Sequence, residues 1–179
     1  RKPCIGLNST PFEIVTSSGD MWNNADSFRF VYEPRTGDFD VKVQLEEMTS
    51  LRYYSKAGLM VRESLDADAR NYHWVAYPAN GADAFELAHR PVKNFGMEHV
   101  PEYEILQHIP YPNFWLRVRR QGSTFFFYRS TDGRNWIEVA RHVPSPTYPN
   151  TIYFGMAVSA WSNAEGSAAR ARFRNYGDY

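Results

Sequence analysis

Two tryptophans in the sequence stand close to groups that can hydrogen-bond sugar hydroxyls. Trp115 alternates with Arg117 and Arg119, and Trp161 is followed two residues later by Asn163. Flat aromatic faces stack on the C–H surfaces of sugar rings, while guanidinium and amide groups form paired hydrogen bonds to neighbouring hydroxyls. These residues predict a carbohydrate-binding platform. The alternative for each tryptophan is structural, with Trp115 covered by an arginine stem and Trp161 closing one end of the core.

Three further side chains could extend such a site. Trp22 lies in the stretch MWNNAD, where its asparagine and aspartate neighbours suit a hydroxyl-rich ligand but are also ordinary turn residues. His73 and Tyr77 share one face of the extended stretch NYHWVAY, because strand side chains alternate between faces. A lone histidine is more often structural than a ligand or a base, so His73 and Tyr77 are secondary candidates.

The stretch GLMVRES, residues 58–64, ends an apolar strand with two opposite charges. Alternation separates them: Glu63 shares a face with Leu59 and Val61, and Arg62 shares one with Gly58. Burying either charge without a partner would cost several kcal/mol. We therefore expect Glu63 to face the other sheet, paired with the backbone or with an arginine, and Arg62 to face a ligand.

The same residues allow an enzymatic alternative. His73 and Tyr77 could act as base and acid near Arg62 on an acidic polysaccharide, as in a lyase or hydrolase with an atypical site, provided that both reach one substrate atom. Other chemistry finds less support. The sequence has no Gly-x-Ser-x-Gly elbow and no glycine-rich phosphate loop, and its five histidines lack metal-ligand spacing. No metal or other cofactor is expected.

Calcium is the one ion left open. Asp66 and Asp68 stand two residues apart in SLDADAR, but the stretch lacks the glycine and the distal glutamate of an EF-hand loop.

The elements that must position these side chains are strands. No window of about a dozen residues has a 3.6-residue apolar period, whereas Phe39, Val41, Val43 and Leu45 alternate with polar residues. Eleven stretches are predicted to be strands: 12–17, 27–33, 38–48, 56–64, 71–77, 83–90, 113–121, 123–130, 135–141, 151–161 and 168–176. So many strands joined by turns predict one all-β domain over residues 1–179, a two-sheet antiparallel sandwich of jelly-roll type.

The connections between strands carry turn signals. Asp132-Gly133 predicts a hairpin between two strands, because glycine supplies the positive φ that tight turns need. Residues 91–112 contain four prolines and little alternation, which predicts a long surface excursion, and residues 143–150 predict a stiff connector.

The amino-acid composition argues against several classes of function. Twenty Lys and Arg balance 20 Asp and Glu, so no net field attracts nucleic acid or anionic lipid. Cys4 is the only cysteine, which excludes an internal disulfide. No apolar run approaches the roughly 18 residues of a membrane span. We expect neither a nucleic-acid partner nor membrane insertion. We interpret the chain as a module of a larger protein, because it opens on Arg1 without a signal-like segment.

Three stretches together resemble the concanavalin A-like lectin/glucanase superfamily: GDMWNNADSFRFVYEPRTGDFDVKVQ, SKAGLMVRESLDADARNYHWVAY and YRSTDGRNWIEVA. The similarity is closer to a poorly characterised group of such domains, often appended to secreted bacterial carbohydrate-active proteins. It covers roughly residues 12 to 175. The resemblance implies two antiparallel sheets, one of them concave, with ligands on the concave face or at its rim. It also implies an extracellular or periplasmic location, and calcium recurs in the superfamily.

Two details qualify the resemblance. The retaining glucanases of the superfamily carry paired glutamates in a Glu-x-Asp-x-Glu pattern, which does not occur here, and glycoside hydrolysis needs two carboxyls flanking one bond. The stretch YRSTDGRNW resembles the Asp-box hairpin of sialidases, one residue short of its usual spacing, and this implies a structural role for Asp132.

These observations favour a non-catalytic carbohydrate-binding or adhesion module that recognises a polysaccharide on a concave sheet face. The alternatives are the atypical lyase or hydrolase and a protein-interaction module with an exposed aromatic patch. The predicted ligand-binding residues are Arg62, Trp115, Arg117, Trp161 and Asn163, with Trp22, His73 and Tyr77 as secondary candidates.

Overall fold

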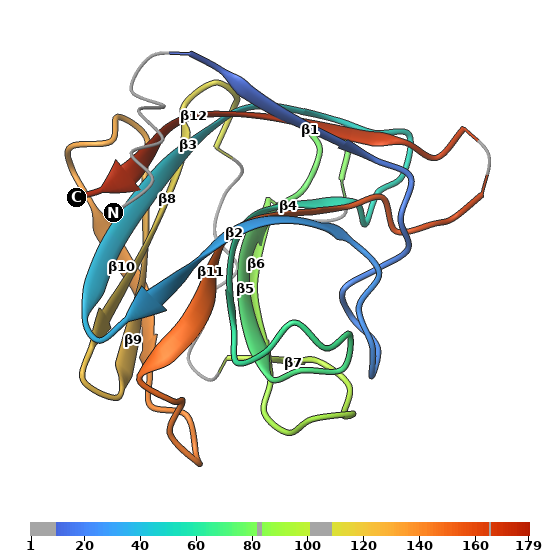
Figure 1. The fold of residues 1–179 in the computed structure, drawn as a ribbon. Coiled ribbons are helices and arrows are strands. Elements are labelled where there is room, and N and C mark those ends of the chain that lie inside the picture. Colours follow the sequence, from blue (N-terminus) through green and yellow to red (C-terminus); the bar gives the residue numbers. More distant parts are fainter. Residues whose placement is uncertain (1–9, 82–83, 101–108, 165) are drawn as a thin grey trace.

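The computed structural model describes residues 10–81, 84–100, 109–164 and 166–179. Within these ranges twelve strands form two antiparallel six-stranded sheets that pack face to face (Figure 1), which confirms the predicted all-β sandwich. The first sheet has the strand order β1-β12-β3-β8-β9-β10 and the second β2-β11-β4-β5-β6-β7. The strands are β1 (Phe12–Thr16), β2 (Arg29–Thr36), β3 (Phe39–Thr49), β4 (Lys56–Arg62), β5 (Asn71–Ala76), β6 (Phe85–Arg90), β7 (Glu98–His99), β8 (Phe114–Gln121), β9 (Thr124–Ser130), β10 (Ile137–His142), β11 (Thr151–Ser159) and β12 (Ala169–Asp178).

The core lies between the two sheets. Val41 and Val43 on β3 are fully buried, and Lys42 between them points away from the core and is half-buried. Leu116 on β8 pairs with Val43 and lies on the same inner face. The two-residue periodicity of the sequence therefore places the inner face of the first sheet correctly.

The hairpin predicted at Asp132-Gly133 is confirmed. It joins β9 to β10, which pair antiparallel, and Gly133 has a φ of +70°. The Asp132 carboxylate accepts hydrogen bonds from the backbone N–H groups of Arg134 and Asn135, both at 2.8 Å. These hydrogen bonds lower the pKa of Asp132 well below its usual range. Asp132 is thus a turn former, as expected.

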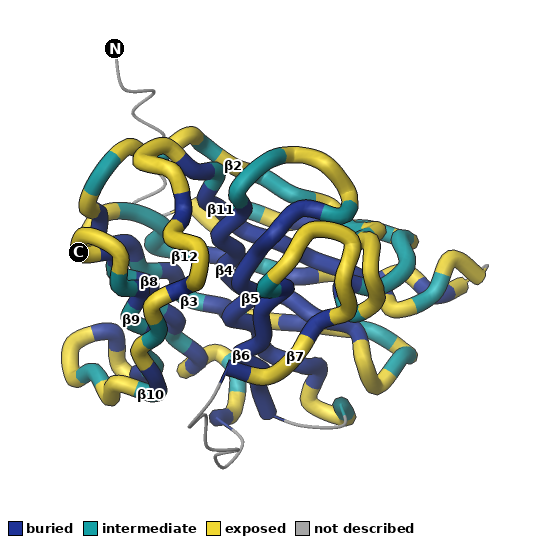
Figure 2. The backbone as a smooth tube through the Cα atoms, turned by 90° about the horizontal axis from the view of Figure 1, so that it is seen from below, coloured by how far each residue is buried: buried dark blue, intermediate teal, exposed yellow. Residues whose placement is uncertain are grey.

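The second sheet differs from the first because both of its faces are covered. Every residue of β4, β5 and β6 is buried, and Figure 2 shows these strands in dark blue beneath loops that are largely exposed. Three loops, residues 17–28, 63–70 and 91–97, lie over the outer face. Their backbones are hydrogen-bonded together, Asp26 N to Ala67 O, Met97 N to Trp22 O and Asn94 N to Asp68 O.

Met21 anchors the first of these loops. Its side chain is fully buried against Met60, Val75 and Ala157, which point outward from three adjacent strands of the second sheet. Apolar packing therefore covers the middle of this face, and it leaves polar side chains on either side of Met21.

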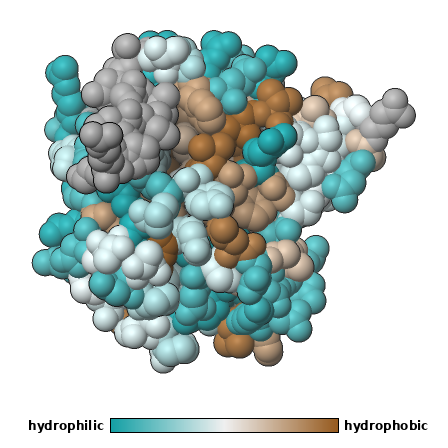
Figure 3. All heavy atoms as spheres, in the orientation of Figure 1, coloured by the Kyte–Doolittle hydropathy of each residue, from teal (hydrophilic) through white to brown (hydrophobic). Residues whose placement is uncertain are grey.

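Most predicted strand boundaries are off by one to three residues, and one strand was not predicted. Strand β4 ends at Arg62, so Glu63 lies just beyond it, and the two-residue strand β7 falls inside the predicted excursion 91–112. Figure 3 shows a mostly hydrophilic face with hydrophobic side chains gathered between the levels of β1 and β2, where the edges of the two sheets approach each other. In the part of the chain that the structure describes, no helix has the length and apolarity needed to cross a membrane.

Candidate functional site

The predicted ligand-binding residues do not form one site. Trp115 and Arg117 project from β8 on the outer face of the first sheet, whereas Arg62 and His73 lie on the outer face of the second sheet. These faces are on opposite sides of the sandwich. Trp161 follows the last strand residue of β11 by two positions, at one end of the molecule. A single ligand could not contact all of these residues together.

Arg62 does not look out toward solvent. Its side chain is 1% exposed, and its Nη1 donates to Asp26. Its Nε and Nη2 donate to backbone carbonyl oxygens of residues 64, 66 and 67. The accessible position expected for Arg62 is therefore wrong. Alternation placed Arg62 on the outer face, but it could not show that loops bury that face.

Asp26 also binds a second buried arginine. Arg90 Nη2 and Nη1 lie 2.6 and 2.8 Å from the two Asp26 carboxylate oxygens, and Asn71 Nδ2 lies 3.2 Å from Oδ2. The side chains of Asp26 and Arg90 are both 0% exposed. We call Asp26, Arg62, Asn71 and Arg90 the Asp26 cluster. It fastens loop 17–28 to the outer face of the second sheet, and it is structural.

Glu63 is paired as predicted. Its carboxylate lies 3.3 Å from Nη1 of Arg70, a residue that is 6% exposed. Arg70 also stacks on Tyr148, which belongs to the core. Glu63 thus lies on the core side of the strand end, half-buried, with an arginine as its partner.

A second polar group lies farther along the same outer face, around Glu86. His73 Nε2 is 2.6 Å from Oε1 of Glu86, and the Tyr77 hydroxyl donates to Oε2 at 2.6 Å. Although burial alone would raise the pKa of Glu86, the hydrogen bonds and positive charge around the carboxylate lower it to about 2. Glu86 is therefore a carboxylate at neutral pH. The structure brings together the predicted pair His73 and Tyr77, and it adds Glu86.

A buried lysine and an exposed histidine flank Glu86. Lys56, 2% exposed, donates to Asp20 at 2.7 Å and to the backbone carbonyl of Tyr54 at 3.2 Å. His99 lies 3.6 Å from Glu86, and its side chain is more than half exposed. The Trp22 ring packs against His99 with centroids 5.4 Å apart. Trp22 is therefore connected to the polar side chains around Glu86 by its contact with His99.

Trp161 forms an exposed aromatic platform with Tyr54. The two residues are 41% and 44% exposed, and their ring centroids are 5.1 Å apart. Trp161 has a φ of +63°, which is uncommon for a bulky residue, and its N–H donates to Gly19 O at 2.9 Å. Asn163 is exposed nearby, with its amide oxygen against Gly19. Asn163 thus lies close to Trp161, and the sequence analysis did not single out Tyr54.

On the outer face of the first sheet, Trp115 and Arg117 are in contact with other parts of the protein. The β9–β10 turn lies on Trp115, because a Cβ on Gly133 would approach three atoms of the Trp115 ring to 2.9 Å. The Arg117 guanidinium makes two hydrogen bonds of 2.6 Å to Asp40 and stacks 3.6 Å from the centroid of the Tyr179 ring. One face of the Trp115 ring and two donor groups of Arg117, Nε and Nη2, are therefore already used within the protein.

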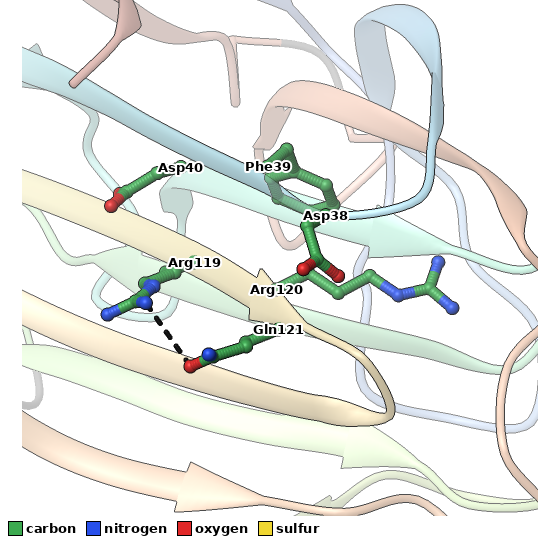
Figure 4. A pocket seen from close by; sticks show the side chains of 6 residues that line it. All are labelled: Asp38, Phe39, Asp40, Arg119, Arg120 and Gln121. Atoms are coloured by element: carbon green, nitrogen blue, oxygen red, sulfur yellow. Dashed lines mark hydrogen bonds between the residues drawn. The ribbon is translucent and has the colours of Figure 1, made fainter.

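A pocket of about 250 Å³ opens beside these residues on the first sheet. Figure 4 shows its lining, in which Arg119 Nη2 donates to Gln121 Oε1 at 3.2 Å. The lining residues are Asp38, Phe39, Asp40, Arg119, Arg120 and Gln121. None of the predicted ligand-binding residues lines this pocket.

The two aspartates considered for calcium have another partner. Lys93 Nζ lies 2.8 Å from Asp66 and 3.6 Å from Asp68, so the ammonium occupies the place between the carboxylates that a cation would take. Across the described ranges, no group of three or more His, Cys, Asp or Glu side chains is arranged to hold a metal ion.

Comparison of the sequence with protein-family models and with curated proteins gives no match. The fold does have solved relatives. A functionally unknown protein from Saccharomyces cerevisiae aligns with a TM-score of 0.65 and 18% identity, over 95% of this chain and 91% of its own. Xylan β-1,4-xylosidase from Bacillus halodurans C-125 aligns with a TM-score of 0.56 and 13% identity, over 90% of this chain but 32% of its own. Peanut lectin aligns with a TM-score of 0.46 and 8% identity, over 96% of this chain and 100% of its own. The first two likenesses show that this β-sandwich occurs both as a nearly whole protein and as about a third of a larger one.

Proposed function

We propose that the chain is a non-catalytic glycan-binding domain that binds a polysaccharide on the platform formed by Trp161 and Tyr54. The observation that carries the proposal is the exposure of two large, adjacent aromatic rings held by a strained backbone. A bulky residue with positive φ costs on the order of 1 kcal/mol or more, and here it keeps the Trp161 ring at the surface instead of in the core.

The surroundings of the platform suit a sugar chain. Asn163 supplies an exposed amide next to Trp161. Tyr54 is linked to the polar outer face of the second sheet, because its carbonyl oxygen accepts from Lys56. Aromatic stacking would contribute most of the affinity, and the amide would select among hydroxyl positions. A domain of this kind would act outside the cell, as part of a larger protein.

The lyase or hydrolase alternative receives less support. His73 is 0% and Tyr77 2% exposed, and both side chains are hydrogen-bonded to Glu86. A base and an acid must each reach a substrate atom. Arg62, the third member of that proposed site, is buried in the Asp26 cluster.

The test is retardation in affinity gels cast with xylan, the polymer named in a structural relative, and with a panel of other neutral and acidic polysaccharides. We expect retardation by at least one of them. Trp161→Ala and Tyr54→Ala should each weaken it by roughly tenfold, equivalent to about 1.4 kcal/mol. Because both residues lie at the surface, 41% and 44% exposed, the thermal unfolding temperature should change little.

Two further variants serve as controls. Tyr32→Ala removes an aromatic ring of matched exposure, 45%, from β2, and it should leave retardation unchanged. Trp115→Ala tests the opposite face. If Trp115→Ala abolished retardation and Trp161→Ala did not, the binding surface would lie on the first sheet and the proposal would be wrong. If no polysaccharide retarded the wild-type protein, a protein partner would become the better explanation of the exposed rings.

A further inference from the structure

A cavity of about 200 Å³ lies between the sheets, at the end of the sandwich where β4 and β6 end. It is lined by Arg70, His89, Pro91, His142, Val143, Pro144, Ser145 and Tyr148. Both sheets contribute to it, since His89 belongs to β6 and His142 to β10. At about 30 Å³ per water, the cavity has room for roughly six waters or for one small ring with its substituents.

One wall of the cavity is formed by a buried histidine, His89. His89 is 6% exposed, and its Nε2 lies 3.2 Å from a carboxylate oxygen of Glu98, whose side chain is 63% exposed. The ring itself is held firmly, because it stacks on Tyr72 with centroids 5.3 Å apart and planes 14° apart. Glu98 does not line the cavity and is itself largely in solvent, so this pair is weak and a ligand hydroxyl can replace the carboxylate as the partner of the nitrogen.

The neighbouring histidine is oriented by a tyrosine. Burial raises the pKa of Tyr72, so its hydroxyl keeps its proton, and this hydroxyl is hydrogen-bonded to Nδ1 of His142. We assign Tyr72 as the donor, which leaves the hydrogen of the neutral His142 ring on Nε2. The His89 and His142 rings are 4.9 Å apart. The two imidazoles thus bring donor and acceptor nitrogens to one cavity.

The charges around the cavity nearly cancel. Arg70 is paired with Glu63 at 3.3 Å, and its Nε and Nη2 donate to the carbonyl oxygens of Pro91 and Pro146. Burial lowers the pKa of both His89 and His142, so both rings are neutral at neutral pH. An anion would therefore gain little here, whereas hydroxyl groups can both donate to and accept from imidazole nitrogens.

We propose that this cavity is a second ligand site, separate from the Trp161–Tyr54 platform, and that it holds a single neutral sugar ring. The apolar side chains of Pro91, Val143 and Pro144 would contact ring C–H groups, and His89 would hydrogen-bond a hydroxyl. The volume admits one ring and not a chain, which fits a free monosaccharide or the terminal unit of a glycan.

The experiment follows the imidazole Cε1–H signals by proton NMR at neutral pH while xylose, arabinose, glucose, galactose and mannose are added in turn. We expect at least one sugar to shift the signals of His89 and His142 saturably and to leave that of buried His73 unchanged. His89→Phe keeps a ring stacked on Tyr72 but removes the imidazole nitrogens, so it should abolish the sugar-induced shift of the His142 signal. The signal that is missing from the spectrum of this variant is that of His89.

A blocking variant separates loss of the site from loss of the fold. Val143 lines the cavity but is 54% exposed, so Val143→Trp should fill the entrance without unfolding the protein and weaken sugar binding by about tenfold or more. Trp161→Ala should leave the shifts unchanged, because the platform lies elsewhere. The proposal is overturned if no neutral sugar shifts the two histidine signals. It is also overturned if the shifts survive in Val143→Trp or vanish in Trp161→Ala. Tighter binding of phosphate or glucuronate than of every neutral sugar would overturn it as well.

Discussion

The outer faces of the two sheets carry the same pair of residue types in opposite settings. On the second sheet, Arg62 binds Asp26 beneath three loops, and neither side chain is more than 1% exposed. On the first sheet, Arg117 binds Asp40 near the surface, where the two side chains are 11% and 24% exposed. A buried arginine–aspartate pair can therefore fasten a loop to a sheet, whereas a partly exposed pair only orders side chains at the surface.

The largest expected difference between the two faces follows from removing each aspartate charge. Asp26→Asn leaves Arg62 and Arg90 buried without a counter-charge, and it should lower the free energy of unfolding by about 3–5 kcal/mol. Asp40→Asn is the matched control on the first sheet and should cost about 1 kcal/mol or less. Urea unfolding of both variants measures this. Equal losses would show that the Asp26 cluster does not fasten the loop.

Glu86 should make the stability of the protein depend on pH in the acid range. The pKa of Glu86 is lowered from 4.5 to about 2 in the folded protein, so its stabilising contribution is present above pH 4.5 and is lost as the pH falls toward 2. At about 1.4 kcal/mol per pKa unit, the loss is on the order of 3 kcal/mol.

Glu86→Gln should remove this part of the pH dependence, as measured by urea unfolding at a series of pH values. Glu138→Gln on β10, an exposed position of the first sheet, should leave the pH dependence as it is in the wild type. An unchanged acid slope in Glu86→Gln would mean that other carboxylates carry it.

The smallest expected effect tests how the first sheet covers Trp115. Gly133→Ala adds a Cβ 2.9 Å from the Trp115 ring at a φ of +70°, whereas Gly122→Ala adds one at a φ of +57° with nothing within 4 Å. Both variants bear backbone strain of about 1 kcal/mol. Gly133→Ala should cost roughly 1 kcal/mol more, because the turn must move off the ring. Thermal unfolding and tryptophan fluorescence would show this, and equal effects would mean that the turn does not rest on Trp115.

The sequence predicted the layers of the fold well, because strand periodicity reports directly on which face is buried. Phe39 to Leu45 alternate as expected, and the Asp132-Gly133 hairpin follows from local turn chemistry. Alternation also placed Arg62 and His73 on the same outer face. Strand β7 was missed because two residues, Glu98 and His99, are too few to show a period.

The surroundings of the predicted site residues were harder to predict, because they depend on contacts between segments far apart in the sequence. Asp26 lies 36 residues before Arg62, and nothing local reveals that its loop crosses the second sheet. One signal was present. Arg62 and Arg90 each end an apolar strand, and a buried arginine needs a carboxylate. Glu86 carried a similar signal, as a charge between the apolar residues Phe85 and Leu87.

The Asp26 cluster has a consequence for the timing of molecular recognition. Because two arginines hold loop 17–28 against the sheet, the segments that carry Trp22 and Gly19, on which Trp161 rests, are already ordered before any ligand arrives. The entropy of ordering this loop is therefore lost during folding and not during association. A sugar would meet a rigid surface, and its affinity would depend on the contacts it makes and not on how readily the loop closes.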